Sequence, residues 1–415
     1  MEQQEARIDI MRVLQVNAVN AIRSTGRNCG ELSYYIRVHD GGCFTAYSDG
    51  PHTENSYRIS SVFECKKHAV LSRITGLQGY FSPKSTAHLI NIIKEVNPDI
   101  VNLGNLHANY LNIIQLLEFL AENNIPTVLV LHDCWPFTGK CTHYTVKDCL
   151  RWQTGCFDCP SLREDNKSWL FDRTSKMWND KKRLWLSIPN LAVVGVSDWI
   201  TNEAKKSPMF KNAKIIRRIY NWIDLDVFKP ANADDIREKY GLTDKKIILG
   251  VSSAWSRKKG LDTFLKVADC LKNDEIMLLV GNMPKISLPK NVISVAATDS
   301  VNELVKYYNA ADVFLQLSEE ETFGKVVAEA LACGTPVVTN GYTANPELVN
   351  ASCGCIARDL SPDVVYSSIE KVLERGKKVY SDFCIEFAKD NFDGEKNMGE
   401  YLKLYREMSD LKNNG

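Results

Sequence analysis

Strand-like and helix-like segments alternate along this chain, and the alternation predicts an α/β fold built on parallel sheets. The predicted strands are short, β-branched and almost continuously apolar, as strands buried on both faces of a parallel sheet are. Helical stretches with capping residues separate them. The chain has 415 residues, more than one hydrophobic core usually serves, so two Rossmann-like domains are expected rather than one sheet.

Nine segments are predicted strands, four before Asp224 and five after it. They are Met11–Val16, Ile100–Leu103, Thr127–Leu131, Leu191–Val196, Lys246–Val251, Ile276–Val280, Val292–Val295, Asp312–Leu317 and Pro336–Thr339. The extended segment Tyr220–Pro230 is the predicted hinge between the two domains, because a proline closes it and a polar stretch follows.

Capping residues mark three helices between these strands. Ser85 is expected to cap a helix over Thr86–Glu95, and the pair Asp299-Ser300 to cap one over Val301–Asn309. A third helix is predicted over Asn109–Glu122, where leucine and isoleucine recur at helical spacing.

Composition excludes several classes of protein. Lys plus Arg and Asp plus Glu each number 51, so the net charge is zero, unlike that of a nonspecific nucleic-acid-binding protein. No run approaches the ~20 apolar residues of a spanning helix. Residues 1–10 lack a positive region followed by an apolar core, so no signal peptide is expected and the cytoplasm is the expected compartment.

The segment Ser318–Val338 carries the most informative pattern. An acidic loop ending at Glu321 follows a predicted strand, and Thr322-Phe323-Gly324 leads into a predicted helix over Lys325–Ala332. Ligands of open α/β sheets bind beyond the carboxyl ends of strands, and backbone N–H groups at a helix N-terminus suit a phosphate. Gly324 would let a ligand approach the backbone closely.

Two acids in this segment, Glu321 and Glu329, stand eight positions apart. A carboxylate can accept hydrogen bonds from two sugar hydroxyls at once. From spacing alone, the competing interpretation is a helix cap at Glu321 and a solvated helix residue at Glu329.

The residues from Glu321 through Glu329 to Gly334-Thr335-Pro336 resemble the E-x7-E signature of retaining glycosyltransferases of family 4. The resemblance implies the GT-B fold, in which two Rossmann-like domains face each other across a cleft, and catalysis without a required metal. It implies that Glu329 binds the ribose of a nucleotide-sugar donor and that Glu321 acts near the transferred sugar. The donor-binding residues between them would be Phe323, Gly324, Lys325 and Val326.

A second resemblance covers the predicted hinge. Asn221, Ile223, Asp224, Phe228 and Pro230 are similar to the family's N-G-I-D-x-x-x-F-x-P segment, with Trp222 in place of the glycine. On this basis we expect an acceptor domain over residues 1–223, with a cysteine-rich insert at about 134–160, and a donor domain over 224–390. A C-terminal helix over 391–415 is expected to pack back on the first domain.

One departure from the family concerns the donor diphosphate. The family usually holds it with an arginine and with the lysine of a K-G pair. Here Lys259-Gly260 keeps the lysine, while the place of the arginine holds Ala254. We predict that Lys259 is the main diphosphate partner, and Arg257 or Lys258 is the candidate for the second positive charge.

In the first half, His132 is the preferred candidate for contact with the donor sugar. Its segment Leu131-His132-Asp133 resembles the family's H-D segment, whereas His107 follows a strand without such a match. Gly26 lies in a small-residue loop that resembles the family's approach to the diphosphate.

Four cysteines, Cys141, Cys149, Cys156 and Cys159, follow the spacing C-x7-C-x6-C-x2-C in a segment poor in apolar residues. Four thiolates, one pair as C-x2-C, can hold a structural zinc ion. Two disulfides and unligated thiols are the alternatives. The segment resembles a subgroup that includes colanic-acid-type exopolysaccharide glycosyltransferases.

The expected function is therefore a retaining transfer of sugar from a nucleotide-sugar donor to a glycan or lipid-linked acceptor in surface or exopolysaccharide synthesis. No cofactor is expected for catalysis, and no nucleic-acid partner. The stretch Trp169–Leu186, with interleaved tryptophans and lysines, is a candidate for peripheral membrane contact, although an ordinary amphipathic domain helix is the preferred interpretation. The alternatives are a nucleotide-sugar epimerase or hydrolase of GT-B architecture and a non-catalytic nucleotide-sugar-binding protein.

Overall fold

A computed structural model describes residues 11–298 and 300–413 of the chain. Within them the chain divides into two compact units. Unit 1 comprises residues up to 196, residues 200–219 and residues from 398 onward, and unit 2 comprises residues 197–199 and 220–397. Residues 1–10, on which the expected lack of a signal peptide rests, and Asp299, one of the predicted capping pair, lie outside the described residues.

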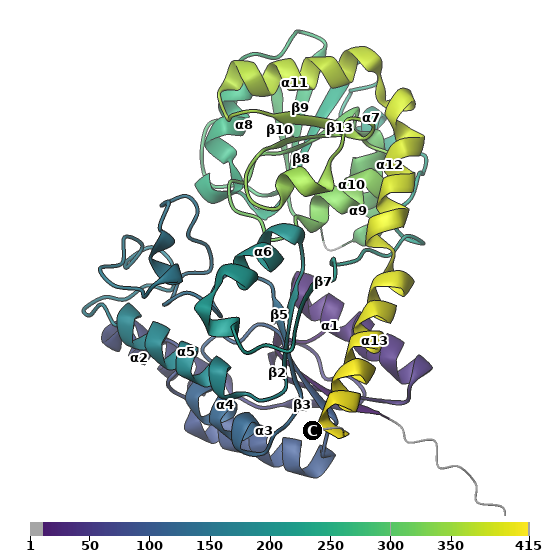
Figure 1. Ribbon diagram of the computed structural model, residues 1–415. Helices are drawn as coiled ribbons and strands as arrows, with labels where there is room; N and C mark the ends of the chain where they lie inside the picture. Colours follow the sequence, from purple (N-terminus) through teal and green to yellow (C-terminus); the bar gives the residue numbers. More distant parts are fainter. Residues whose placement is uncertain (1–10, 299, 414–415) are drawn as a thin grey trace, which may run out of the picture. The chain divides into compact units, whose positions relative to one another are not determined.

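Unit 1 is built on a sheet of seven parallel strands in the order β3-β2-β1-β4-β5-β6-β7. The strands are β1 (Arg12–Val19), β2 (Gly42–Asp49), β3 (Ser56–Arg58), β4 (Ile100–Leu103), β5 (Thr127–Leu131), β6 (Leu191–Gly195) and β7 (Ile215–Arg218). Its helices are α1 (Arg23–His39), α2 (Val62–Thr75), α3 (Pro83–Val96), α4 (Ile113–Glu122), α5 (Thr174–Ser187), most of α6 (Asp198–Lys206) and most of α13 (Gly394–Asn413). Figure 1 shows α3, α4 and α5 on one side of this sheet and α1 with α13 on the other.

Unit 2 holds a sheet of six parallel strands in the order β10-β9-β8-β11-β12-β13. The strands are β8 (Lys246–Ala254), β9 (Glu275–Asn282), β10 (Val292–Val295), β11 (Val313–Gln316), β12 (Val337–Asn340) and β13 (Gly354–Ala357). The helices are α7 (Asp234–Lys239), α8 (Leu261–Ala268), α9 (Val301–Ala310), α10 (Lys325–Ala332), α11 (Pro362–Arg375) and α12 (Lys377–Phe392). The prediction of two parallel-sheet units is confirmed.

Four strands were not predicted, namely β2, β3, β7 and β13. β7 and β13 lie at the ends of their sheets, where half-exposed strands do not need a continuous apolar run. β2 mixes apolar with polar residues, and Thr45 in it is buried beside the Ser33 hydroxyl at 3.0 Å. A polar residue inside a sheet is stable when it is hydrogen-bonded, and this partner is not visible in the sequence.

Two helix starts were predicted wrongly. Helix α3 begins at Pro83, so Ser85 is a buried residue of its first turn rather than its cap. Proline suits this position because the N–H that it lacks would have no acceptor inside the helix. Helix α4 begins at Ile113, because the Asn112 side chain accepts hydrogen bonds from Ile114 N–H and Gln115 N–H at 3.0 and 3.2 Å.

Candidate active site

The order of strands in unit 2 marks where a ligand would bind. β8 pairs with β9 on one side and with β11 on the other, so the connections leave this point in opposite directions. In doubly wound sheets, ligands bind beyond the carboxyl ends of the strands at such a switch point. The short helix Arg257–Lys259 follows β8, and the acidic loop and α10 follow β11. Both predicted donor-binding segments therefore lie at the switch point of unit 2.

Lys259 and Glu321 form an ion pair there, with Nζ and Oε1 2.6 Å apart. Lys259 is held by the chain reversal at Gly260, which has a positive φ of 76° and packs so closely that an added Cβ would come within 2.7 Å of the Leu317 carbonyl oxygen. The Glu321 N–H donates to the Thr343 hydroxyl at 3.0 Å. A cation and a carboxylate from two different strand ends are thus brought into contact.

Arg257 and Lys258 precede Lys259 in the same short helix, and both side chains are exposed. Within the described residues neither forms an ion pair with a carboxylate. The choice of the second diphosphate partner therefore stays a prediction.

Glu329 lies inside α10 and is buried, with 7% of its surface exposed. The Tyr308 hydroxyl, from α9, donates a hydrogen bond to its carboxylate at 2.7 Å. Burial, and then the Glu329 charge, raise the pKa of Tyr308 well above its usual range, so this hydroxyl stays protonated and remains a donor. The interpretation of Glu329 as a solvated helix residue is wrong, because solvent barely reaches it.

The N-terminus of α10 is formed as the sequence predicts. Gly324 has φ 79° and ψ 60°, a left-handed conformation that glycine adopts without strain, and α10 spans Lys325–Ala332. Phe323 is buried beneath the turn, whereas Lys325 and Val326 in the first turn are half-buried. First-turn N–H groups have no acceptor four residues earlier in the helix, so this end favours an anion.

Several supporting residues were missed by the sequence reasoning. Asn345 donates to the Ser318 carbonyl at 2.8 Å and to Asn340 Oδ1 at 2.9 Å, which ties the loop after β12 to the acidic loop. Thr343, in that loop, holds the Glu321 backbone. The available signal was Gly341 with Pro346-Glu347, which resembles a lengthened form of the family's G-x-P-E loop.

Glu347 binds the part of unit 2 that connects to unit 1. Its carboxylate accepts hydrogen bonds from the backbone N–H groups of Asp198 and Trp199 at 2.6 and 3.1 Å. The Tyr220 hydroxyl donates to it at 3.1 Å. Burial is the main cause that raises the pKa of Glu347. One carboxylate thus anchors residues from both short connections, 197–199 and the segment from 220 onward.

In unit 1, the ends of β4 and β5 bring two histidines to one place. His132 and Asp133 follow β5, and His107 Nδ1 lies 3.5 Å from Asp133 Oδ2. Burial lowers the pKa of His132 to about 4, so its ring is neutral near pH 7. Gly26 is buried in the first turn of α1, where an added Cβ would lie 3.1 Å from Val19 Cγ2. A role in donor binding stays a prediction for His132 and for Gly26.

The four cysteines of the predicted zinc site are half-buried free thiols in one segment of unit 1. Burial raises the pKa of Cys141 and of Cys156 to about 12, and it raises that of Cys159 as well. Across residues 11–298 and 300–413, no three His, Cys, Asp or Glu side chains stand together in a way that could hold a metal ion. The donor set suits zinc but its arrangement does not, and zinc binding stays a prediction.

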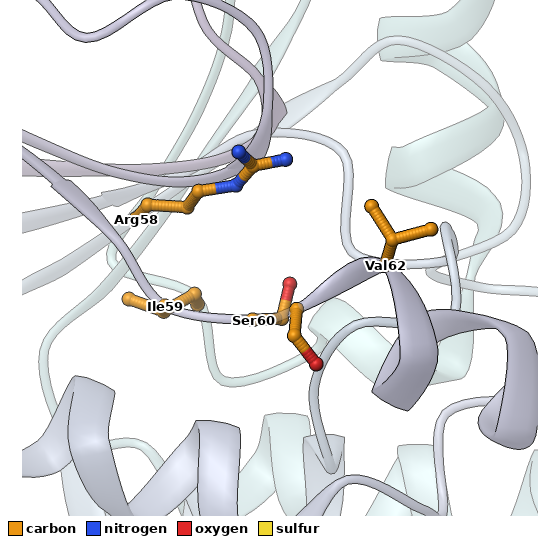
Figure 2. A pocket seen from close by; sticks show the side chains of 5 residues that line it. Arg58, Ile59, Ser60 and Val62 are labelled. Carbon is orange, nitrogen blue, oxygen red and sulfur yellow. The ribbon is translucent and has the colours of Figure 1, made fainter.

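A pocket of about 440 Å³ lies elsewhere in unit 1, between the end of β3 and the start of α2. Figure 2 shows Arg58, Ile59, Ser60 and Val62 around it, and Ser61 completes the lining. The Arg58 guanidinium donates to the Ser48 carbonyl at 3.0 Å. None of these residues belongs to the predicted donor site.

Residues 232–383, which contain the switch point, match the family model described as glycosyl transferases group 1. Over these residues, the chain is similar to glycosyl transferases of group 1. The matched residues include Lys259, Glu321 and Glu329.

Two curated relatives extend the comparison. The chain is 31% identical over 169 residues to N-acetyl-alpha-D-glucosaminyl L-malate synthase of Bacillus anthracis, which covers 38% of this chain and 43% of that protein. It is 22% identical over 328 residues to the putative colanic acid biosynthesis glycosyl transferase WcaC of Escherichia coli, covering 76% of this chain and 78% of that protein. The chain thus spans less than half of the Bacillus relative.

Solved structures share the architecture over nearly the whole chain. A glycosyltransferase from Rickettsia africae superposes with a TM-score of 0.67 at 17% identity, covering 96% of this chain and 99% of that one. Anabaena HepE in complex with UDP gives 0.65 at 14%, covering 96% and 100%. At such low identity the likeness establishes the fold, and the predicted GT-B fold class is confirmed.

Among the described residues, none of the helices combines the length and the apolar character needed to cross a bilayer.

Proposed function

We propose that this protein is a retaining glycosyltransferase that moves a sugar from a nucleotide-sugar donor to a glycan or lipid-linked acceptor. The observation that carries the proposal is the arrangement at the switch point of unit 2. There Lys259 contacts Glu321, α10 begins after Gly324, and Glu329 is buried within α10. The solved structures of Anabaena HepE in complex with UDP and with UDP-glucose support a nucleotide-sugar ligand, and they make UDP-sugars the first donors to test.

The proposed reaction breaks the bond between the anomeric carbon and the diphosphate, and it forms a bond from that carbon to an acceptor hydroxyl. Negative charge builds up on the departing diphosphate. Lys259 and the first-turn N–H groups of α10 would stabilise that charge. Retention of configuration is attributed to attack from the face that the diphosphate leaves, and Glu321 would act near the sugar.

The ion pair with Glu321 holds the Lys259 ammonium in place. A bound diphosphate would compete with Glu321 for that ammonium. The carboxylate would then be released towards the sugar at the moment when the lysine engages the phosphate. Glu329, which Tyr308 orients, would accept hydrogen bonds from the ribose.

The biological setting belongs to the same proposal. The relation to WcaC supports a role in surface or exopolysaccharide synthesis. We place the reaction in the cytoplasm, with peripheral contact at the inner face of the membrane that would present a lipid-linked acceptor.

A thermal-shift screen of nucleotide sugars would test this function. A donor that binds the native state raises the melting temperature by mass action, so one nucleotide series is expected to shift it with increasing concentration. NMR spectroscopy of the product formed with a lipid-linked or glycan acceptor should then show the donor's anomeric configuration. The absence of any stabilising nucleotide sugar would contradict the proposal. Turnover of the donor without an acceptor would favour the epimerase or hydrolase alternative, and binding without turnover would favour a non-catalytic protein.

A further inference from the structure

Helix α2 buries polar side chains and exposes apolar ones, the reverse of an ordinary surface helix. Its buried side chains are two polar residues, His68 and Ser72. Four of its five large apolar side chains are exposed instead, with Leu71 half-buried, and Phe63 keeps 75% of its surface in solvent. Phe63, Val70 and Ile74 recur at spacings that place them on one helical face. An exposed apolar stripe of this kind usually marks a site that binds a protein, a ligand or a membrane.

A second exposed apolar segment, Trp169-Leu170-Phe171, lies against the end of this helix. The Trp169 N–H donates to the Arg73 carbonyl at 2.6 Å. At Gly76, which caps α2, an added Cβ would come within 2.4 Å of the Phe171 carbonyl oxygen. The two segments therefore form one surface. We call it the α2 surface and define it by Phe63, Val70, Ile74, Trp169, Leu170 and Phe171.

This surface differs from the stretch that the sequence suggested for membrane contact. Within Trp169–Leu186, the tryptophans of α5, Trp178 and Trp185, are buried in unit 1. Lys181 is buried with them and donates to the Trp135 and Thr138 carbonyls. α5 is thus an ordinary domain helix. Of the stretch Trp169–Leu186, only Trp169, Leu170 and Phe171 belong to the α2 surface.

Basic side chains surround the α2 surface. Lys66, Lys67 and Arg73 on α2 are exposed, and the guanidinium groups of Arg73 and Arg173 lie 5.9 and 5.4 Å from the ring centres of Trp169 and Phe171. The one acid of α2, Glu64, is engaged at the helix start, where the hydroxyls of Ser61 and Ser85 donate to it at 3.4 and 3.2 Å. A second acid, Asp172, is exposed next to Phe171, and it accepts hydrogen bonds from the Cys159 and Thr174 N–H groups at 2.7 and 2.9 Å. The four basic side chains at this surface therefore outnumber its two acids.

We propose that the α2 surface docks on the headgroup region of an anionic lipid bilayer. Tryptophan and phenylalanine with exposed apolar neighbours partition into the boundary between headgroups and acyl chains, and lysine and arginine beside them bind anionic headgroups. The proposal identifies the surface that would make the peripheral membrane contact in the proposed function. It rests on exposure and charge alone, and its test needs neither donor nor acceptor.

The test uses the full chain and vesicles in a flotation assay. Vesicles of phosphatidylcholine mixed with phosphatidylglycerol should bind the protein, whereas phosphatidylcholine alone should bind it weakly. Binding to the mixture should fall as salt is raised. Replacing two exposed anchors, Phe63→Ser with Leu170→Ser, should weaken binding about tenfold or more, because two apolar side chains no longer enter the boundary region.

The matched control is Phe383→Ser, which removes an exposed phenylalanine of α12 in unit 2 and should leave vesicle binding unchanged. Quenching of tryptophan fluorescence by brominated lipid, present in the wild type and lost in Trp169→Phe, would place the α2 surface at the bilayer. All variants change exposed residues, so unchanged melting temperatures are expected to show that they fold.

Three results would overturn the inference. The first is a wild-type protein that does not bind anionic vesicles, and the second is a double variant that binds them as well as the wild type does. The third is a wild-type dimer that the double variant converts to a monomer, which would make the α2 surface an interface between copies of the chain.

Discussion

At the scale of single residues, the site of unit 2 is a set of charged groups that hold one another in place. Lys259 contacts Glu321, and Tyr308 contacts Glu329, at 2.6 and 2.7 Å. Each contact joins residues that lie 62 or 21 positions apart in the chain. Hydrogen bonds to charged groups are stronger and more directional than those between neutral groups, so these partners fix the side chains before a ligand arrives.

We expect Lys259→Ala to lower turnover on an identified donor by about a hundredfold, because the developing charge on the diphosphate loses its main cation. The loss should fall more on kcat than on KM, since that charge is greatest in the transition state. Steady-state kinetics would measure it. Lys258→Ala, which changes an exposed neighbour in the same short helix, should have a milder effect.

One pattern of turnover would contradict the assignment of Lys259. If Lys259→Ala turns over at the wild-type rate while Arg257→Ala does not, the diphosphate partner is Arg257. The ion pair with Glu321 would then serve only to stabilise unit 2.

Tyr308→Phe should weaken nucleotide binding by about three- to tenfold, because Glu329 loses the hydroxyl that orients it and a buried hydrogen bond of this kind contributes roughly 0.5–1.5 kcal/mol. Glu329→Ala should cost more, roughly 1.5–3 kcal/mol, since the charge-assisted contacts to the ribose disappear. Isothermal titration calorimetry would give both values.

The control for Tyr308 lies next to it. Tyr307 is also buried in α9, but its hydroxyl donates to Glu303 at 3.1 Å. Tyr307→Phe should leave nucleotide affinity unchanged. Equal losses in the two tyrosine variants would mean that α9 acts through packing rather than through the bond to Glu329. Unchanged affinity in Glu329→Ala for every nucleotide that binds the wild type would refute the ribose assignment.

At the scale of elements, the cysteine segment between β5 and α5 lacks regular structure apart from the short helix Leu150–Gln153. Aromatic side chains of the segment itself pack together, with the ring centre of Trp152 5.0 Å from that of Phe137 and 5.3 Å from that of Tyr144. Lys140, which is buried, donates to the carbonyls of Ser161 and Leu162. These contacts help to hold the segment, and its cysteine spacing is typical of zinc sites.

Metal analysis of protein purified without added zinc tests whether the four cysteines bind zinc or are unligated. If Cys141, Cys149, Cys156 and Cys159 bind zinc, about one equivalent should be found, because a closed structural site takes a single ion. The double change Cys156→Ser with Cys159→Ser should remove it and lower the melting temperature. Cys270→Ser, a half-buried cysteine of unit 2, is the control. A metal-free wild type that is fully folded would refute zinc binding and leave the thiols unligated.

At the scale of the whole molecule, stability should depend on pH through two histidines of unit 1. Burial lowers the pKa of His68 and of His132 from 6.5 to about 4. The geometry of His68 agrees, because its Nε2 accepts a hydrogen bond from the Gly79 N–H at 3.3 Å and must be unprotonated to do so. Between pH 6.5 and about pH 4, these two histidines therefore bind more protons in the unfolded chain than in the native protein.

The free energy of unfolding should therefore fall as the pH drops from about 6.5 to 4, and His68 alone should account for about 3 kcal/mol of that loss. Chemical denaturation across this range would measure it. His68→Gln should flatten the dependence, whereas His88→Gln, a change in an exposed residue of α3, should not. A free energy of unfolding that does not change between these pH values would contradict the assignment.

The sequence by itself determined much of the fold and one half of the candidate site. Ile100–Leu103, Thr127–Leu131 and Val292–Val295 were predicted to the residue, because a short apolar run bounded by turn residues has few other stable conformations. The helix Lys325–Ala332 was also predicted in full, since Gly324 and Gly334 mark its ends locally. Glu321 and Glu329 could be chosen because their spacing matches a family signature.

Only the tertiary structure decided which groups meet. The contact of Lys259 with Glu321 depends on the order of β8 and β11 in the sheet, and that of Tyr308 with Glu329 on the packing of α9 against α10. Phe63 is likewise exposed because the packing of unit 1 buries the other face of α2. Local patterns report the conformation of a segment, whereas these contacts depend on strand order and helix orientation, which are global properties of the chain.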